Sequence, residues 1–438
     1  MKTISIGLLG CGTVGVGVAR LLLENRALIK SRLGVDLLLK YVADIDTATD
    51  RGITFDAGVF VNDAFAVVDD PDIDIIVEMI GGQGIAKALI LKAMENGKPV
   101  VTANKALMAA EGNILIEKAR AANVDLAYEA SVGGCMPIIK SLREALVGNH
   151  IHAMTGILNG TCNYILSRIT DEGSAFEKVL AEAQAEGYAE ADPTLDVEGH
   201  DAAHKLAIIT ALAFGMEINL ADTYTEGISK ITPMDIENAR QFGYRIKLLA
   251  IAKNNNGQIE ARVHPTMIPE DNQLSKISGT LNAITISGDA IGDVLLCGHG
   301  AGQLPTASAV ISDVVDIARN IMAGIARRIP VLSYQPEYIR NIPVMPMDEL
   351  VTHYYLRLEA LDKPGVLSII SGVLGKHGIS IQSVHQKGRR TAGAVPIVML
   401  THRARELDIK NAMAALAALD VVEGEPTVIR IEDENNHV

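Results

Sequence analysis

The chain has 438 residues and a formal net charge of −14, with 48% hydrophobic but only 4% aromatic residues. This length is enough for two or three domains, and the acidic balance argues against nucleic acid or an anionic membrane as a partner, since both require basic surfaces. The first residues lack the pattern of a signal peptide, and no apolar run approaches the ~20 residues of a transmembrane helix, so we expect a cytoplasmic protein with no membrane partner.

A glycine-rich motif follows the first predicted strand, Thr3 to Leu9, and a helical pattern then runs from Val14 to about Ile29. This is G-x-G-x-x-G between a strand and a helix, the context in which it binds dinucleotides. The glycines permit a tight turn and close approach of the pyrophosphate, and the helix N-terminus attracts its charge. The motif predicts a cofactor site made by Gly10, Gly12, Thr13, Val14 and Gly15.

The second predicted strand, Val35 to Ala43, ends at Asp44. An acidic residue here accepts hydrogen bonds from the adenosine ribose and repels a 2′-phosphate, which favours NAD over NADP. Arg51 offers a cation nearby that would soften this preference. The alternative is that Asp44 is an ordinary residue of the turn.

Further alternation of strands and helices continues the parallel sheet: strand Ile73 to Ile80, helix Ile85 to Asn96 and strand Pro99 to Ala103. Lys105 follows the last of these strands, at the sheet edge where ligands bind. A surface lysine at a helix N-terminus would be disfavoured by the helix dipole, so Lys105 is predicted to contact a ligand.

The predicted strand Val124 to Ser131 leads into a turn that combines Glu129 with several backbone carbonyls, which suits a hard cation with oxygen ligands. Long alternating segments then predict a largely antiparallel sheet domain, with a hairpin turn at residues 254–257. A second glycine-rich segment, residues 298–302, opens a helix from about Thr306 to Ala323 that can approach the cofactor. The predicted strands are Ile151 to Ile157, Lys247 to Lys253, Ile259 to Met267 and Ala283 to Gly288.

Between these strands, Gly187 to Lys205 gathers carboxylates and one lysine before an apolar helix, His204 to Phe214. Asp201 and Lys205 are four residues apart and share one helix face. Such a cluster either caps the helix in solvent or lines a polar cavity as paired charges. His200 and His204 have the spacing of a zinc-binding helix, but no third ligand is evident.

The four cysteines, Cys11, Cys135, Cys162 and Cys297, lie in or beside glycine-rich turns. A nucleophilic thiol would make the protein an acylating aldehyde dehydrogenase. The simpler interpretation, which we favour, is a small and slightly apolar residue beside glycine.

A proline-bearing segment, Ile329 to Asp348, reads as a linker. After it, about eighty residues form a βαββαβ pattern, enough for an independent small domain. Its predicted elements are strand Tyr354 to Leu361, helix Val366 to His377, strand Ser380 to Gln386, strand Ala394 to Thr401, helix Asp408 to Leu419 and strand Thr427 to Ile431.

Together these motifs resemble homoserine dehydrogenase in its monofunctional form with a C-terminal ACT domain. The residues that carry the resemblance are 10–15, 103–106, 128–137, 156–164, 187–205 and 298–309. The resemblance implies an α/β and α+β multidomain fold. It consists of a Rossmann-type dinucleotide-binding domain (1–130, with the helix at about 305–325 returning to it), a mixed α+β substrate and oligomerisation domain (131–330), a linker (331–352) and an ACT regulatory domain (353–432).

The family interconverts L-homoserine and L-aspartate 4-semialdehyde with NAD or NADP, in threonine and methionine biosynthesis. By resemblance Lys205 is the catalytic acid/base and Lys105 the second lysine at cofactor and substrate. Substrate-binding carboxylates correspond to Glu190, Asp196 and Asp201, cofactor contacts to Gly187 and Gly302, and a sodium site to Glu129 and the carbonyls of Val132, Gly134 and Met136. Departures from the family pattern are Cys135, Cys162 and Asp44, and the last leaves the cofactor preference open.

A lysine can act as acid/base if burial or a neighbouring cation lowers its pKa. The ACT resemblance implies feedback, with threonine as the expected effector at Asp362, Pro364, Gly365 and Val366, and a homodimer or homotetramer is expected. The alternatives are a dimerisation module without a ligand, an aspartate-semialdehyde dehydrogenase dependent on a reactive thiol, and a regulator with a dead active site.

Overall fold

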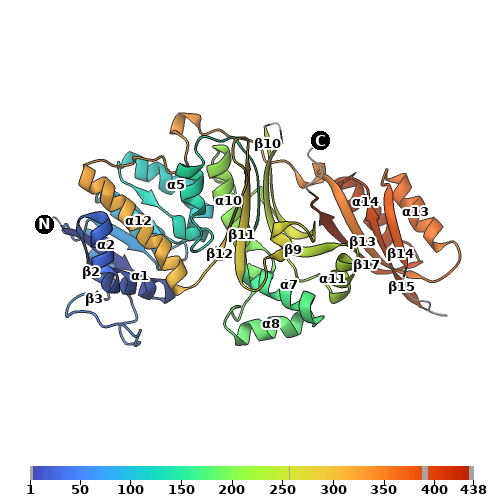
Figure 1. Ribbon diagram of the computed structural model, residues 1–438, viewed down its shortest axis with the longest axis horizontal. Coiled ribbons are helices and arrows are strands. Elements are labelled where there is room, and N and C mark those ends of the chain that lie inside the picture. Colours follow the sequence, from blue (N-terminus) through green and yellow to red (C-terminus); the bar gives the residue numbers. More distant parts are fainter. Residues whose placement is uncertain (1–2, 256, 387–392, 434–438) are drawn as a thin grey trace.

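The computed structural model describes residues 3–255, 257–386 and 393–433. Three regions follow one another along the longest axis of the molecule, with the N-terminal region and the C-terminal region at opposite ends (Figure 1). The middle region therefore lies between the two.

The N-terminal region is a parallel sheet with helices on both sides. Its six described strands have the order β3-β2-β1-β4-β5-β6, and every described pair is parallel. The order reverses between β1 and β4, which is where such sheets bind their ligands. The elements are β1 Thr3–Leu9, α1 Thr13–Glu24, α2 Arg26–Leu33, β2 Asp36–Ala43, β3 Phe60–Val61, α3 Ala64–Asp69, β4 Ile75–Glu78, α4 Ile85–Glu95, β5 Val100–Thr102, α5 Lys105–Ala121 and β6 Leu126–Ala127.

Several predicted elements of this region were too long. The helix expected from Val14 to Ile29 breaks at Asn25, whose backbone is not helical (φ −96°, ψ 13°). The strand expected to reach Ser131 ends with β6 at Ala127, since residues Glu129–Ser131 form a 3-10 turn. There the N–H of Glu129 donates to the Asp313 carboxylate instead of to a neighbouring strand (2.8 Å).

A helix from late in the chain completes the N-terminal region. Helix α12, Gln303–Ala323, lies beside α1 and is drawn in orange next to blue in Figure 1. Gly17 of α1 permits this approach, since a Cβ there would lie 2.6 Å from the carbonyl oxygen of Gln303. Apolar α12 residues such as Val310 and Val314 are buried with the first strands.

The middle region is the largely antiparallel sheet predicted, and it carries two strands that were missed, β8 (Tyr224–Thr225) and β12 (Gly292–His299). The strands β12-β11-β7-β9-β10 are neighbours in that order, each pair antiparallel. Strand β12 was not predicted, because its side chains are exposed or only half-buried and show no clear alternation. Asn256 of the predicted hairpin turn lies outside the described residues. The strands are β7 Ile151–Ile157, β8 Tyr224–Thr225, β9 Tyr244–Asn255, β10 Gln258–Pro269, β11 Leu281–Gly288 and β12 Gly292–His299.

Helices α7 and α10 pack against this sheet, and both contribute residues to the site described below. Helix α10 begins at His200, one turn earlier than the apolar pattern indicated, so that Asp201 and Lys205 are both helical. The helices of this region are α6 Ile138–Lys140, α7 Gly160–Glu172, α8 Phe176–Ala185, α9 Thr194–Val197, α10 His200–Phe214 and α11 Pro233–Gln241.

The C-terminal region has the predicted βαββαβ order, and its sheet joins that of the middle region. Its strands have the order β17-β13-β15-β14, and β17 pairs in parallel with β10 through Thr266–Arg430 and Met267–Ile431. One sheet therefore runs through both regions. The elements are β13 Val351–Leu361, α13 Val366–Lys376, β14 Ile381–Gln386, β15 Ala394–Thr401, β16 Ala404–Arg405, α14 Glu406–Ala417 and β17 Val422–Ile431.

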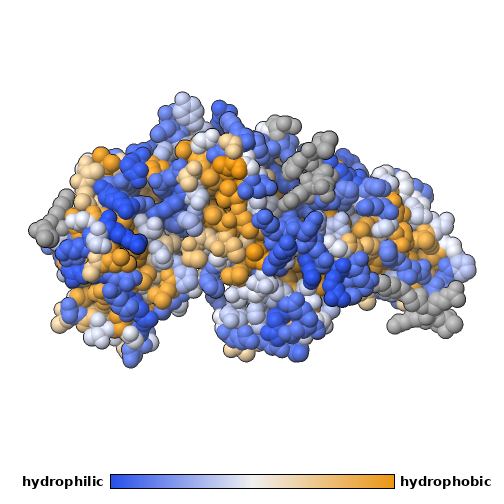
Figure 2. Space-filling view, in the orientation of Figure 1, coloured by the Kyte–Doolittle hydropathy of each residue, from blue (hydrophilic) through white to orange (hydrophobic). Residues whose placement is uncertain are grey.

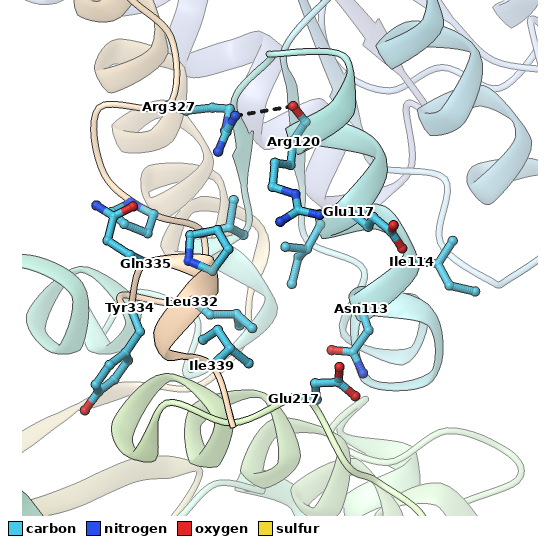
Figure 3. A pocket seen from close by; sticks show the side chains of 14 residues that line it. Asn113, Ile114, Glu117, Arg120, Glu217, Arg327, Leu332, Tyr334, Gln335 and Ile339 are labelled. Atoms are coloured by element: carbon cyan, nitrogen blue, oxygen red, sulfur yellow. Dashed lines mark hydrogen bonds between the residues drawn. The ribbon is translucent and has the colours of Figure 1, made fainter. Parts of the chain in front are cut away.

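The segment predicted as a linker is packed against the rest of the protein. Isolated bridges join Met216 to Arg340 and Ile259 to Val344. Its first part and helix α5 border a cavity of about 410 Å³, across which Arg327 donates to the carbonyl oxygen of Arg120 (Figure 3). None of the predicted site residues lines this cavity.

Apolar side chains gather on the face of the molecule drawn in Figure 2, over the part of the middle region where Figure 1 draws β11 and β12. Val294 and Leu295 of β12 are only half-buried. Among the helices of the described ranges, none has both the length and the apolar composition that crossing a bilayer requires.

Candidate active site

A cavity of about 690 Å³ lies between the N-terminal and middle regions. Both regions contribute to its wall, which includes Val14 in the first turn of α1 and the glycine-rich segment that precedes α12. The predicted site residues that line it are Val14, Lys105, Gly134, Gly187, Glu190, Asp196, Asp201, Lys205 and Gly302.

The three glycines before and within α1 have different surroundings. Gly10 has φ +92°, and a Cβ there would lie 2.7 Å from the backbone of Met79 and Ile80. A Cβ on Gly15 would lie 2.1 Å from the carbonyl oxygen of Gly10, whereas a Cβ on Gly12 would meet no atom within 4 Å. Gly10 thus makes the turn, Gly15 allows the helix to pack on it, and Gly12 leaves its outer side open to a phosphate. These residues fit a dinucleotide.

Asp44 lies at the end of β2 and is tied to the same turn. Its carboxylate accepts from the N–H of Cys11 (2.6 Å) and of Asp46 (2.9 Å). The guanidinium of Arg51 lies 3.6 Å from this carboxylate and donates to the carbonyl oxygen of Cys11. A carboxylate and a cation therefore lie together at the strand end where the adenosine ribose of a dinucleotide would bind.

Lys105, Asp201 and Lys205 meet although Lys105 is about a hundred residues away in sequence. Nζ of Lys105 lies 2.8 Å from one Asp201 oxygen, and Nζ of Lys205 donates to the other at 2.7 Å. Lys205 also donates to the carbonyl oxygen of Leu158 (2.6 Å), and its side chain is almost fully buried. One ammonium group from the N-terminus of α5 and one from α10 thus share a single carboxylate at the start of α10.

This arrangement decides the charges at the site. Burial alone would raise the pKa of Asp201, but the two ammonium groups hold that pKa well below its ordinary value. Burial disfavours the charge on Lys105, yet Asp201 outweighs burial and raises the pKa of Lys105. The lowered pKa expected of a catalytic lysine is therefore not found at Lys105, because Asp201 is its counterion.

Two residues that the motif analysis left without a role hold the carboxylates in place. Asn159, the N-cap of α7, donates through Nδ2 to Asp196 (2.7 Å) and to Asp201 (2.8 Å), and its Oδ1 accepts from the N–H of Cys162. Thr161 donates to the other oxygen of Asp196 (3.0 Å). An Asn directly before a helix is an N-cap signal, but nothing local indicates which distant carboxylates it contacts. The Glu190 side chain is exposed and lines the cavity.

Glu129 is a buried carboxylate that accepts its hydrogen bonds from the backbone. Its two oxygens accept from the N–H groups of Ile139 (3.0 Å) and Lys140 (2.7 Å), and within the described ranges no side-chain cation forms an ion pair with it. Burial and the neighbouring Asp313 raise its pKa to about 8. A metal cation would favour the charged form, so this residue fits the expected sodium site. The other expected ligands, Val132, Gly134 and Met136, follow in the same turn, where Gly134 has φ +58°.

The cysteines and histidines give less support to the competing chemistries. Burial raises the pKa of the Cys11 and Cys162 thiols, which disfavours their thiolates, while Cys135 and Cys297 are exposed. Over the described ranges there is no group of three or more His, Cys, Asp or Glu side chains that could hold a metal ion. Burial lowers the pKa of His204. Among the described residues, Nδ1 of this side chain has no hydrogen-bond partner.

The predicted effector turn lies far from this cavity, in the C-terminal region (Figure 1). It contains Asp362, Pro364, Gly365 and Val366, and it joins β13 to α13. Gly365 has φ +92° and precedes the first turn of α13. The Asp362 carboxylate accepts from the side chain of Gln386 on β14 (3.4 Å).

Comparison with known proteins covers almost the whole chain. The family models for the homoserine dehydrogenase NAD-binding domain, homoserine dehydrogenase and the ACT domain match residues 10–129, 137–315 and 354–421. The homoserine dehydrogenase of Neisseria gonorrhoeae is 48% identical over 99% of both chains, and that of Pseudomonas aeruginosa is 45% identical over 99% of this chain and 100% of the relative.

Solved structures agree with these matches. A homoserine dehydrogenase from Thiobacillus denitrificans has a TM-score of 0.93 and 46% identity over 99% of both chains. A hyperthermophilic archaeal homoserine dehydrogenase in complex with NADPH has a TM-score of 0.62 and 25% identity, and the match covers 72% of this chain and 98% of that one. The chain belongs to the homoserine dehydrogenase family and is an oxidoreductase with an NAD-binding domain and a C-terminal ACT domain.

Proposed function

We propose that the protein interconverts L-homoserine and L-aspartate 4-semialdehyde, on the route to threonine and methionine, with Lys205 as the acid/base. The observation that supports this best is the meeting of Lys105 and Lys205 on Asp201 in the cavity that also contains Val14 and Gly302. A bound nicotinamide supplies the hydride acceptor or donor. The chain's own residues then have to move one proton at the substrate oxygen.

Lys205 is suited to that proton transfer. Two of the three N–H groups of its ammonium are engaged by Asp201 and Leu158, which leaves one for the substrate oxygen. Lys105 is about one-third exposed and adds a second positive charge over the cavity, which stabilises negative charge on that oxygen. Asp196 and Glu190 bind the α-ammonium group of the substrate, with Asn159 and Thr161 fixing the Asp196 carboxylate.

The direct test is a spectrophotometric assay of the purified protein with L-homoserine and each dinucleotide. We expect reduction of the dinucleotide that depends on homoserine, and the reverse reaction with L-aspartate 4-semialdehyde. If the protein instead requires phosphate and loses activity on thiol alkylation, it is an aspartate-semialdehyde dehydrogenase and the proposed homoserine dehydrogenase activity is wrong.

Asp44 is proposed to make the protein prefer NAD, with Arg51 allowing some use of NADP. Asp44→Ser should shift the ratio of kcat/KM for NAD to that for NADP toward NADP by about 10–100-fold, because it removes charge-assisted hydrogen bonds to the ribose. Steady-state kinetics with both dinucleotides measures this. Arg51→Met should shift the ratio the other way, and Asp46→Ser, which changes the neighbouring exposed carboxylate, is the control. An unchanged ratio in Asp44→Ser would show that another residue sets the preference.

A sodium ion is proposed at Glu129. Its presence can be tested through the pH dependence of the protein's stability. Folding raises the pKa of Glu129 from 4.5 to about 8, so the folded chain keeps a proton that the unfolded chain releases in this range. Stability therefore falls as the pH rises from about 4.5 to 8 unless a cation takes the place of the proton. In choline chloride we expect Tm to fall over this range, and sodium chloride should raise Tm at pH 8.5 more than at pH 5.5. Glu129→Gln should remove the sodium effect, whereas equal effects of both salts at pH 8.5 would rule the site out.

Threonine is proposed as the effector at the turn that contains Asp362 and Gly365. An α-carboxylate there would lie at the N-terminus of α13, an eleven-residue helix whose dipole attracts negative charge. We expect saturating L-threonine to lower activity and raise Tm, and L-valine, which lacks the hydroxyl group, to do neither. If threonine changes neither quantity, the C-terminal region has another role, such as dimerisation.

A homodimer or homotetramer is proposed as well. The half-buried apolar side chains of the edge strand β12, including Val294 and Leu295, form part of a surface that a second copy would cover (Figure 2).

A further inference from the structure

Asn282 carries a buried side-chain amide that the roles above do not explain. It is the second residue of β11 and is only 1% exposed. Within the described ranges its Oδ1 has no hydrogen-bond partner. Proteins satisfy nearly all buried polar groups, so an unpaired oxygen beside a cavity indicates that a bound molecule pairs with it.

The place of this amide is well defined. Asn282 lines the same cavity as Lys105 and Lys205. A Cβ on Gly160 would lie 3.4 Å from its Oδ1, and a Cβ on Gly300 would lie 2.0 Å from its Nδ2. Gly160 starts α7, next to the residues that hold the substrate carboxylates, while Gly300 belongs to the glycine-rich segment before α12. The amide therefore stands between the proposed substrate side and the proposed cofactor side.

The chemistry of an amide restricts which ligand group it serves. The charged groups of the substrate are matched by the lysines and carboxylates of the same cavity. A primary amide is neutral and offers an acceptor oxygen beside a donor NH₂ group, which is the complement of another primary amide. The nicotinamide carboxamide has that character, and it is attached next to the ring carbon that exchanges hydride.

We infer that Asn282 accepts a hydrogen bond from the nicotinamide carboxamide and thereby fixes which face of the ring meets the substrate. This inference rests on the proposed dehydrogenase function. It makes Asn282 a positioning residue for the cofactor ring, since its contact sets where the reacting carbon lies without taking part in the transfer.

The test compares NAD with 3-acetylpyridine adenine dinucleotide, in which a methyl group replaces the NH₂ of the carboxamide. Asn282→Leu keeps the volume of the side chain and removes its hydrogen bonds. We expect kcat/KM with NAD to fall about tenfold in this variant, the size of one lost hydrogen bond, while kcat/KM with the acetylpyridine analogue changes less than about twofold. Asn282→Asp keeps the acceptor and should retain the wild-type preference for NAD over the analogue.

The remaining outcomes are also decisive. An equal loss with both dinucleotides, or a rise only in the KM for homoserine, would overturn the inference, because the amide would then serve a ribose hydroxyl, the substrate or the fold. Tm of each variant identifies a folding defect, and Asn282→Ser provides a smaller replacement if the leucine variant does not fold. A wild-type protein that oxidises no homoserine with either dinucleotide would instead reject the proposed function itself.

Discussion

Lys205→Met should lower kcat about 1,000-fold while the Kd for NADH changes less than threefold. General acid/base catalysis by a placed side chain contributes roughly 10²–10⁴ to a rate, and methionine keeps the length of lysine but cannot carry a proton. The remaining Lys105 still pairs with Asp201, so the cavity keeps one of its two positive charges. Turnover by stopped-flow and NADH binding by fluorescence measure the two quantities separately.

Lys247→Met is the matched control for this variant. Lys247 is as buried as Lys205 and donates to Asn163 and to the carbonyl oxygen of Ile277, but it does not line the active-site cavity. Both variants remove one buried ammonium, so both should lose stability, and only Lys205→Met should lose turnover. If the two variants lose kcat equally, Lys205 acts through the fold and not as acid/base.

Arg430→Met should lower the free energy of unfolding by about 3–5 kcal/mol, because it leaves a buried carboxylate without its cation. Nε of Arg430 donates to Glu406 at 2.9 Å, and both residues are almost fully buried. Arg430 also donates to Glu226 of the middle region at 2.7 Å. Scanning calorimetry and urea unfolding measure the loss, which should appear in the transition of the C-terminal region.

The double variant Arg430→Met with Glu406→Leu should recover much of that loss, since a buried ion pair can be replaced by apolar residues at little cost. Arg405→Met is the exposed control, because its pair with Asp408 is open to water and should contribute less than about 1 kcal/mol. A loss in Arg430→Met as small as in this control would mean that water reaches Glu406 and stabilises its charge.

The fold was largely predictable because its signals are local. The glycine motif at residues 10–15 and the apolar strands around it define the parallel sheet within a few residues, and the βαββαβ pattern is equally regular. Strand ends were less predictable. Residues 129–131 leave the sheet because a carboxylate 184 residues away, on Asp313, takes the N–H of Glu129.

The candidate site was predictable in its residue types but not in its pairings. The positions of Lys105 and Lys205 followed from a strand end and a helix face, whereas their joint contact with Asp201 depends on how two domains pack. Asn159 lies within the family motif at residues 156–164, yet its hydrogen bonds to Asp196 and Asp201 span 37 and 42 residues. Such contacts arise from the tertiary structure and leave no pattern in the neighbouring sequence.

The pairing of β10 with β17 has a consequence for engineering this enzyme. A chain that ends before residue 351 would lack β17, so β10 would lose the hydrogen bonds of that pairing. The buried Arg262 would also lose its hydrogen bond to Glu432, which is 2.9 Å away. The shortened chain would expose an unpaired strand edge, which promotes aggregation, and Arg262 would keep Glu260, 3.0 Å away, but lose its second carboxylate. Variants that test the proposed control by threonine should therefore carry single replacements in the turn at Asp362, with the whole chain kept.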